Sequence, residues 1–171
     1  MPLNKQAIKE IFAELNKELL TDNLFVEVIL IGGSAGIFLS DKTRPTMDID
    51  VFLKTLDNQE RVTDLFLSYD IENVTVASVP DPNEMTFSDV LKWSNLIVYI
   101  PDFYSLAITK LFTTRAKDEQ DLLTYILLGI EDFEKLDNLI KENSIDYVGR
   151  VDDPFLNVNR LEDYKKQLNI E

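Results

Sequence analysis

The chain contains no cysteine and no histidine among its 171 residues. Thiol and imidazole nucleophiles, imidazole general bases, zinc fingers and other sites with Cys or His ligands are therefore excluded. Any chemistry depends on carboxylates, hydroxyls, lysine and arginine, and any metal ion is a hard one such as Mg²⁺ or Mn²⁺. A chain of this length buries roughly 70% of its surface on folding, so it needs no disulfide to hold a core.

Positive charge is also scarce. The chain has 17 Lys and Arg against 31 Asp and Glu, a net charge of −14, and no segment forms a basic patch. This balance opposes unassisted binding of nucleic acid or of an anionic membrane, and it suits either solubility or docking to a basic partner protein. No apolar run approaches the roughly 20 residues of a membrane span, and no targeting signal is visible. We therefore expect a cytoplasmic protein that does not contact membranes.

The spacing of apolar residues predicts a mixture of helices and strands over the first hundred residues and helices alone thereafter. Helices are predicted at 3–20, 34–39, 57–68, 102–115, 118–128, 131–142 and 159–169, and strands at 25–31, 47–53, 71–79 and 96–100. Loops are predicted at 80–83 and 148–158.

This order of elements predicts the α/β (α+β) class, with a mixed β-sheet flanked by helices and a helical C-terminal part. The length favours a single domain over residues 1–171. Its core is expected at about 25–128 and its helical C-terminal extension at about 129–171.

One stretch has a pattern typical of phosphate chemistry. A buried strand ends at Gly32-Gly33, a helix begins at Ser34, and Asp48 and Asp50 follow on a second strand. The glycines permit unusual backbone angles and close approach of a ligand, and the free amides at the helix start can hold a phosphate. Alternation along the strand turns Asp48 and Asp50 to the same side, where they can bind one or two divalent cations that neutralise a triphosphate.

This stretch resembles the signature of the nucleotidyltransferase superfamily related to DNA polymerase β, and the matching residues are Gly33, Ser34, Asp48 and Asp50. That signature is Gly-Gly or Gly-Ser followed about a dozen residues later by Asp-x-Asp or Asp-x-Glu. A Lys-bearing helix and the run Arg-x-Lys-Asp-x-x-Asp-Leu at 115–122 are similar to a small bacterial branch of the superfamily. That branch is related to toxins of toxin–antitoxin and abortive-infection modules.

The resemblance spans residues 25–128 and implies a role for each matched residue. Asp48 and Asp50 would bind the metal ions, Gly33 and Ser34 would contact the nucleotide phosphates, and Lys110 would reach the triphosphate. In the second motif, Asp118 is interpreted as a helix cap, and Asp121 as a partner of Arg115 or Lys117. On the residues alone, Lys110 is equally well interpreted as a surface lysine whose stem covers apolar neighbours.

The activity implied is metal-dependent transfer of a nucleotidyl group from an NTP to an acceptor hydroxyl, with Mg²⁺ or Mn²⁺ as cofactor. The acceptor would be RNA or a protein, and the resemblance to the toxin branch also implies a place in a toxin–antitoxin or defence module. Active members of the superfamily carry a third acid on a neighbouring strand, and the strand predicted at 71–79 offers only Glu72, with Asp70 just before it.

A second hypothesis is a catalytically inactive member that acts as an acidic binding or regulatory partner, as an antitoxin does. The two hypotheses differ in whether a carboxylate from residues 70–79 lies close to Asp48 and Asp50. The aromatic residues Trp93, Tyr99, Phe103 and Tyr104 could stack a base, but they are assigned to the core.

Overall fold

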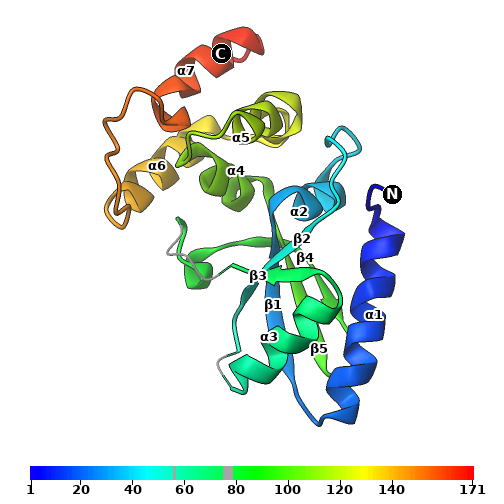
Figure 1. Ribbon diagram of the computed structural model, residues 1–171. Helices are drawn as coiled ribbons and strands as arrows, with labels where there is room; N and C mark the ends of the chain where they lie inside the picture. Colours follow the sequence, from blue (N-terminus) through cyan, green and yellow to red (C-terminus); the bar gives the residue numbers. More distant parts are fainter. Residues whose placement is uncertain (56, 75–78) are drawn as a thin grey trace. The chain divides into compact units, whose positions relative to one another are not determined.

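Five strands form one mixed sheet in the computed structural model, which describes residues 1–55, 57–74 and 79–171 (Figure 1). The strand order is β3-β2-β1-β5-β4. The strands are β1 (Val26–Ile31), β2 (Ile49–Leu53), β3 (Ile71–Asn73), β4 (Phe87–Lys92) and β5 (Leu96–Pro101). Strand β1 is antiparallel to β2 and parallel to β5, β2 is parallel to β3, and β4 is antiparallel to β5. This mixed sheet with its helices confirms the predicted α/β class.

The chain divides into two compact units, which we describe separately. The first comprises Met1–Val76 and Thr86–Asp102 and the second comprises Ala77–Met85 and Phe103–Glu171. The first unit holds the sheet together with α1 (Lys5–Thr21), α2 (Gly32–Leu39) and α3 (Gln59–Ser68). That the chain functions as one domain over 1–171 stays a prediction.

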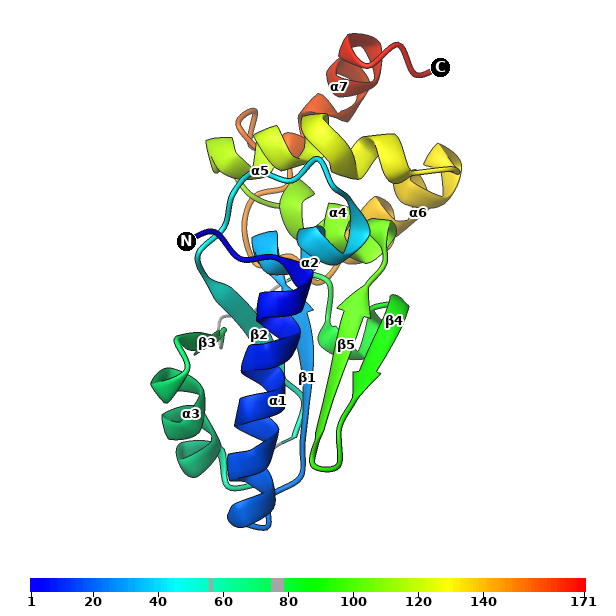
Figure 2. The ribbon, with the colours of Figure 1, turned by 90° about the vertical axis from the view of Figure 1, so that its right-hand side faces the viewer.

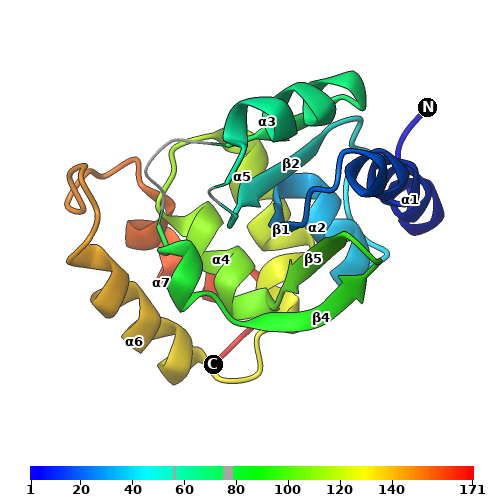
Figure 3. The same ribbon diagram turned by 90° about the horizontal axis from the view of Figure 1, so that it is seen from below.

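Helices α1 and α3 of the first unit lie against one face of the sheet (Figures 2 and 3). The apolar stripe predicted for the first helix is buried there, because residues three and four apart share one side of a helix. The residues buried in this layer include Ile8, Phe12, Leu15 and Leu19 of α1, Val62, Leu65 and Phe66 of α3, and Val28, Leu30, Val51, Val98 and Ile100 of the sheet. Helix α1 begins where the Asn4 side chain accepts a hydrogen bond of 2.8 Å from the Ala7 amide.

Two elements of the first unit differ from the sequence prediction. Strand β4 is not predicted, since it lies at the edge of the sheet, is mostly solvent-exposed and has an irregular register between Phe87 and Asp89. An edge strand of this kind lacks the strict alternation on which a prediction depends. The strand predicted at 71–79 is observed as β3 over Ile71–Asn73, and residues 75–78 lie outside the described part of the chain.

The second unit is helical where it is described, which confirms the predicted helical C-terminal part. Its helices are α4 (Phe103–Leu111), α5 (Ala116–Asp121), α6 (Phe133–Ser144) and α7 (Leu161–Gln167), with 3₁₀ turns η1 (Pro82–Glu84), η3 (Leu127–Gly129) and η4 (Asn157–Arg160) and a π-helical turn η2 (Leu122–Ile126). The helix predicted at 118–128 is thus α5 continued by a π turn and a 3₁₀ turn. No helix in the described part of the chain is both long and apolar enough to span a bilayer.

Candidate functional site

The first motif forms a turn without a connecting loop, because α2 begins at Gly32 directly after the last residue of β1. Gly32 has a φ of +66°, a conformation that residues with a Cβ rarely adopt. A Cβ at this position would also lie 3.1 Å from Oδ2 of Asp50. Both the backbone conformation and the lack of space for a Cβ therefore require glycine at position 32. The Asp50 carboxylate lies directly against the backbone where α2 starts.

The second glycine brings the chain that leads into β2 against the same helix. A Cβ on Gly33 would lie 3.1 Å from Oγ1 and 3.2 Å from Cβ of Thr46, which is buried. The carbonyl of Thr46 accepts a hydrogen bond of 2.9 Å from the Leu3 amide. Thr46 is thus held between the N-terminal segment and α2, two residues before Asp48.

Strand pairing brings Asp50 to this turn. Asp50 pairs with Ile31 in the antiparallel register of β1 and β2, so it stands beside the last residue before the glycines. Asp48 immediately precedes β2 and is exposed, whereas Asp50 is half-buried. Asp48 is two residues from Asp50, the spacing at which side chains of an extended chain point to the same side.

A third acid lies beside Asp50 on the neighbouring strand. Glu72 of β3 pairs with Asp50 in the parallel register of β2 and β3, and residues so paired share one face of the sheet. The Glu72 side chain is exposed. Among the described residues, no group of three acidic side chains is arranged to hold a metal ion. The backbone thus brings Glu72 next to Asp50, but the carboxylates do not converge in this structure.

Ser34 is almost fully buried and its hydroxyl donates a hydrogen bond of 3.0 Å to the carbonyl of Ile31. The hydroxyl is therefore used to hold the turn between β1 and α2. The backbone amides of Gly33 and Ser34 lie in the first turn of α2, where helix geometry leaves amides without a carbonyl partner in the same helix.

Lys110 lies in the second unit, on α4, and its side chain is only 4% exposed. Its ammonium Nζ lies 2.8 Å from Oδ1 of Asp118 and 3.1 Å from Oδ2 of Asp121, both of which are also buried. The interpretation of Lys110 as a surface lysine is therefore wrong. The spacing in the sequence does not indicate that Lys110 pairs with these two acids, because they lie on α5, beyond a turn of the chain.

Asp118 is the centre of this buried cluster. Besides Lys110, it accepts hydrogen bonds of 2.8 Å from Thr113 Oγ1 and 2.7 Å from Arg115 Nε. Burial by itself raises the pKa of the Asp118 carboxyl. The charge of Lys110 and the hydrogen bonds from Lys110, Arg115 and Thr113 outweigh burial, so the pKa of Asp118 lies below its ordinary value.

A family model described as "Nucleotidyltransferase of unknown function (DUF6036)" matches residues 6–169 of the chain. The chain belongs to this nucleotidyltransferase family. No match was found among curated proteins or among solved structures. The family match covers both units and extends beyond the residues 25–128 that carry the resemblance in the sequence.

For this member of the nucleotidyltransferase family, sequence reasoning named Gly33, Ser34, Asp48 and Asp50. The structure places Gly33 and Ser34 in the first turn of α2, Asp50 against Gly32, and Asp48 immediately before β2. That these residues form the functional site stays a prediction. Sequence reasoning did not name Thr46, because its packing against Gly33 is a tertiary contact that no sequence motif indicates. It named Glu72 only as the one acid available, and the register of β2 and β3 adds that Glu72 is adjacent to Asp50.

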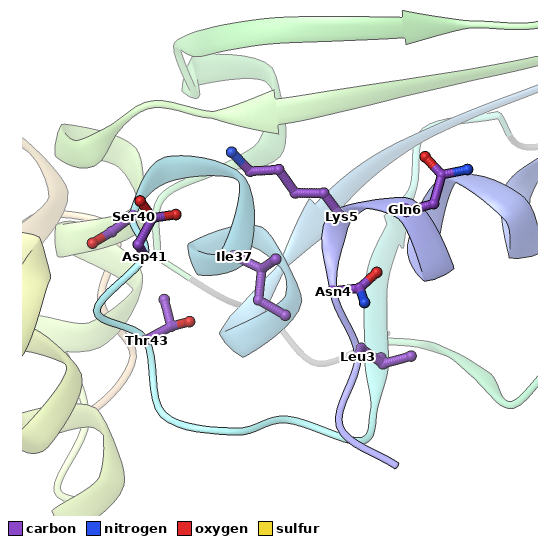
Figure 4. A pocket seen from close by; sticks show the side chains of 8 residues that line it. All are labelled: Leu3, Asn4, Lys5, Gln6, Ile37, Ser40, Asp41 and Thr43. Atoms are coloured by element: carbon purple, nitrogen blue, oxygen red, sulfur yellow. The ribbon is translucent and has the colours of Figure 1, made fainter.

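An open hollow of about 430 Å³ lies elsewhere in the first unit (Figure 4). It is lined by the segment entering α1, by Ile37 of α2 and by the loop after α2; the residues are Leu3, Asn4, Lys5, Gln6, Ile37, Ser40, Asp41 and Thr43. None of the motif residues lines it, so the hollow is separate from the carboxylates of β2.

Proposed function

We propose that the chain transfers a nucleotidyl group from an NTP to an acceptor hydroxyl, with a divalent cation held by Asp48 and Asp50. The observation that carries this proposal is the contact between Asp50 and the glycine turn at which α2 begins. The Asp50 carboxylate lies close enough to Gly32 that a Cβ there would be only 3.1 Å from Oδ2. Carboxylates suited to a cation and helix amides suited to a phosphate therefore occur side by side.

The donor set fits Mg²⁺ or Mn²⁺. Mg²⁺ is usually bound by one or two carboxylates and takes its remaining ligands from substrate phosphates and water. Asp48 and Asp50 would supply two carboxylates, and Glu72, which pairs with Asp50 between β2 and β3, is the candidate for a third. When bound, the cation neutralises charge on the phosphates and stabilises the departing pyrophosphate.

The chain's own groups would position the triphosphate. The amides of Gly33 and Ser34 would donate hydrogen bonds to phosphate oxygens at the positive end of α2. The Ser34 hydroxyl already donates to Ile31, so its part is to fix the turn rather than to bind phosphate. For Lys110 we propose a structural role in the second unit, since a phosphate contact would require it to leave two buried carboxylates.

The alternative is a catalytically inactive family member that acts as an acidic binding or regulatory partner. It is favoured by the observation that no three acids are arranged to hold a metal ion in the described part of the chain. The net charge of −14 suits a basic partner under either proposal, and it makes a free RNA acceptor less favourable than a protein.

The test is the thermal midpoint of the protein with ATP, GTP, CTP or UTP, each with and without Mg²⁺ or Mn²⁺. A ligand that binds only the folded state stabilises it by about 2.7 kcal/mol at a hundred times its dissociation constant. For a chain of this size that amounts to a rise of roughly 5–10 °C. We expect a metal-dependent rise that is lost in Asp48→Asn with Asp50→Asn.

The matched control is Asp57→Asn with Asp64→Asn, which removes two exposed charges elsewhere in the first unit. We expect this control to keep the rise. Glu72→Gln should keep nucleotide binding but slow the release of pyrophosphate that follows attack of an acceptor hydroxyl, or of water in its place, on the α-phosphate. If no NTP raises the midpoint with either metal, the transferase proposal is wrong and the binding-partner alternative is favoured.

A further inference from the structure

Four side chains form a cluster on the sheet of the first unit. Tyr99 and Phe87 lie with ring centroids 4.9 Å apart, and Nζ of Lys54 lies 4.6 Å from the Tyr99 centroid and 5.9 Å from that of Phe87. The Tyr99 hydroxyl donates a hydrogen bond of 2.7 Å to Oε1 of Glu27. We refer to Lys54, Phe87 and Tyr99 as the aromatic platform.

The aromatic platform shares a sheet face with Asp50. Asp50 pairs with Ile31 and Tyr99 pairs with Ile29, and these two β1 residues alternate onto the same face. The residues that alternate with them along the strands, Val28, Val51 and Val98, are fully buried, as expected of the face that α1 and α3 cover (Figure 3). With strands about 4.8 Å apart and a rise of about 3.3 Å per residue, the Cα atoms of Asp50 and Tyr99 are roughly 12 Å apart. A side chain from each can therefore contact opposite ends of one nucleotide.

The chemistry of the aromatic platform suits a nucleobase. Lys54, Phe87 and Tyr99 are each half-buried, so part of every side chain is accessible. Lys54 makes no ion pair with any described residue, although the chain has 31 acids. Its ammonium offers three hydrogen-bond donors and the rings offer a surface for stacking. A base presents both acceptor atoms and a π face.

We propose that the aromatic platform binds the base of the nucleoside triphosphate while Asp48 and Asp50 act at its phosphates. This inference rests on the proposed function, because it concerns the other end of the same substrate. Stacking on aromatic side chains tolerates every base, so the aromatic platform favours nucleotides over base-free phosphates more strongly than it selects among bases.

The experiment compares the dissociation constants of ATP and of ribose 5′-triphosphate, which lacks a base, by calorimetry in the presence of Mg²⁺. In the wild-type protein we expect ATP to bind at least tenfold more tightly. Tyr99→Leu keeps apolar volume but removes the ring, and it should weaken ATP about tenfold and leave ribose 5′-triphosphate unchanged. Tyr99→Phe keeps the ring and loses only the bond to Glu27, so it should retain most of the preference.

Tyr69→Leu is the matched control, since Tyr69 is also half-buried but follows α3 outside the cluster. Equal affinities of the wild type for the two ligands would overturn the inference without any variant. It would also be overturned if Tyr99→Leu weakened both ligands equally, or no more than Tyr69→Leu does. Either of these results leaves the proposed function intact, provided that ATP binds to the wild type and that Asp48→Asn with Asp50→Asn abolishes this binding. If neither ATP nor ribose 5′-triphosphate binds to the wild type, both proposals fail.

Discussion

Replacing Lys110 by methionine tests the role of the buried cluster in the second unit. The substitution keeps a long apolar side chain but leaves Asp118 and Asp121 buried without the ammonium that lies 2.8 Å and 3.1 Å from them. Removing one partner of a buried ion pair costs about 3–5 kcal/mol. Asp118 retains Arg115 and Thr113, so we expect the lower end of that range, about 3 kcal/mol.

Urea unfolding measures this loss. With a slope of about 2 kcal/mol per molar urea, a loss of about 3 kcal/mol lowers the midpoint by roughly 1.5 M. Far-UV circular dichroism reports on both units, whereas fluorescence of Trp93, the single tryptophan, reports on the first, where it contacts Phe12. We expect the circular dichroism transition to shift in Lys110→Met.

Lys141→Met is the control, because Lys141 is exposed on α6 in the same unit. Adding Asp121→Asn to Lys110→Met removes one of the two buried negative charges that the Lys110 ammonium opposes, and it should restore part of the stability. A Lys110→Met protein within about 0.5 kcal/mol of wild type would refute the reasoning. If that variant also lost ATP binding, Lys110 would instead be assigned to the triphosphate.

Three further predictions concern single residues. Gly32→Ala should cost at least about 1–2 kcal/mol in thermal unfolding, because alanine is strained at a φ of +66° and its Cβ meets Asp50; unchanged stability would contradict the geometry. The pKa of Asp118 is lower in the folded state than in the unfolded chain, so its stabilisation is present above about pH 4 and is lost as the pH falls through the folded-state pKa. Asp118→Asn should therefore reduce the loss of unfolding free energy that the wild type shows as the pH falls below about 4. An equally steep loss in the variant would contradict the role given to Asp118. Burial, followed by the charge of Glu119, raises the pKa of Tyr164 to about 12, so its contribution is complete below about pH 10 and is lost as the pH rises through 12. Tyr164→Phe should remove that alkaline loss in a pH series of urea midpoints, and an unchanged alkaline limb would show that Tyr164 is not its source.

Elements that depend on local pattern were predictable. The apolar stripe of α1, the β-branched run of β1 and the alternation in β2 each reflect a periodicity of a single segment, which is visible in the sequence. Strand β4 was not predictable, because an exposed edge strand with an irregular register lacks such a periodicity. The α4 helix is predicted to reach residue 115 but ends at Leu111, and just beyond it the Thr113 hydroxyl donates to the Lys110 carbonyl.

The sequence by itself determined the residue types available for chemistry, the two motifs and their order, and the mixed α/β class. Only the tertiary structure decided which of these residues meet. The antiparallel register of β1 and β2 brings Asp50 against Gly32, and the parallel register of β3 brings Glu72 beside Asp50. Burial likewise decided that Lys110 pairs with Asp118 and Asp121. Strand register and the burial of a charge both arise from contacts between distant segments, which local spacing does not encode.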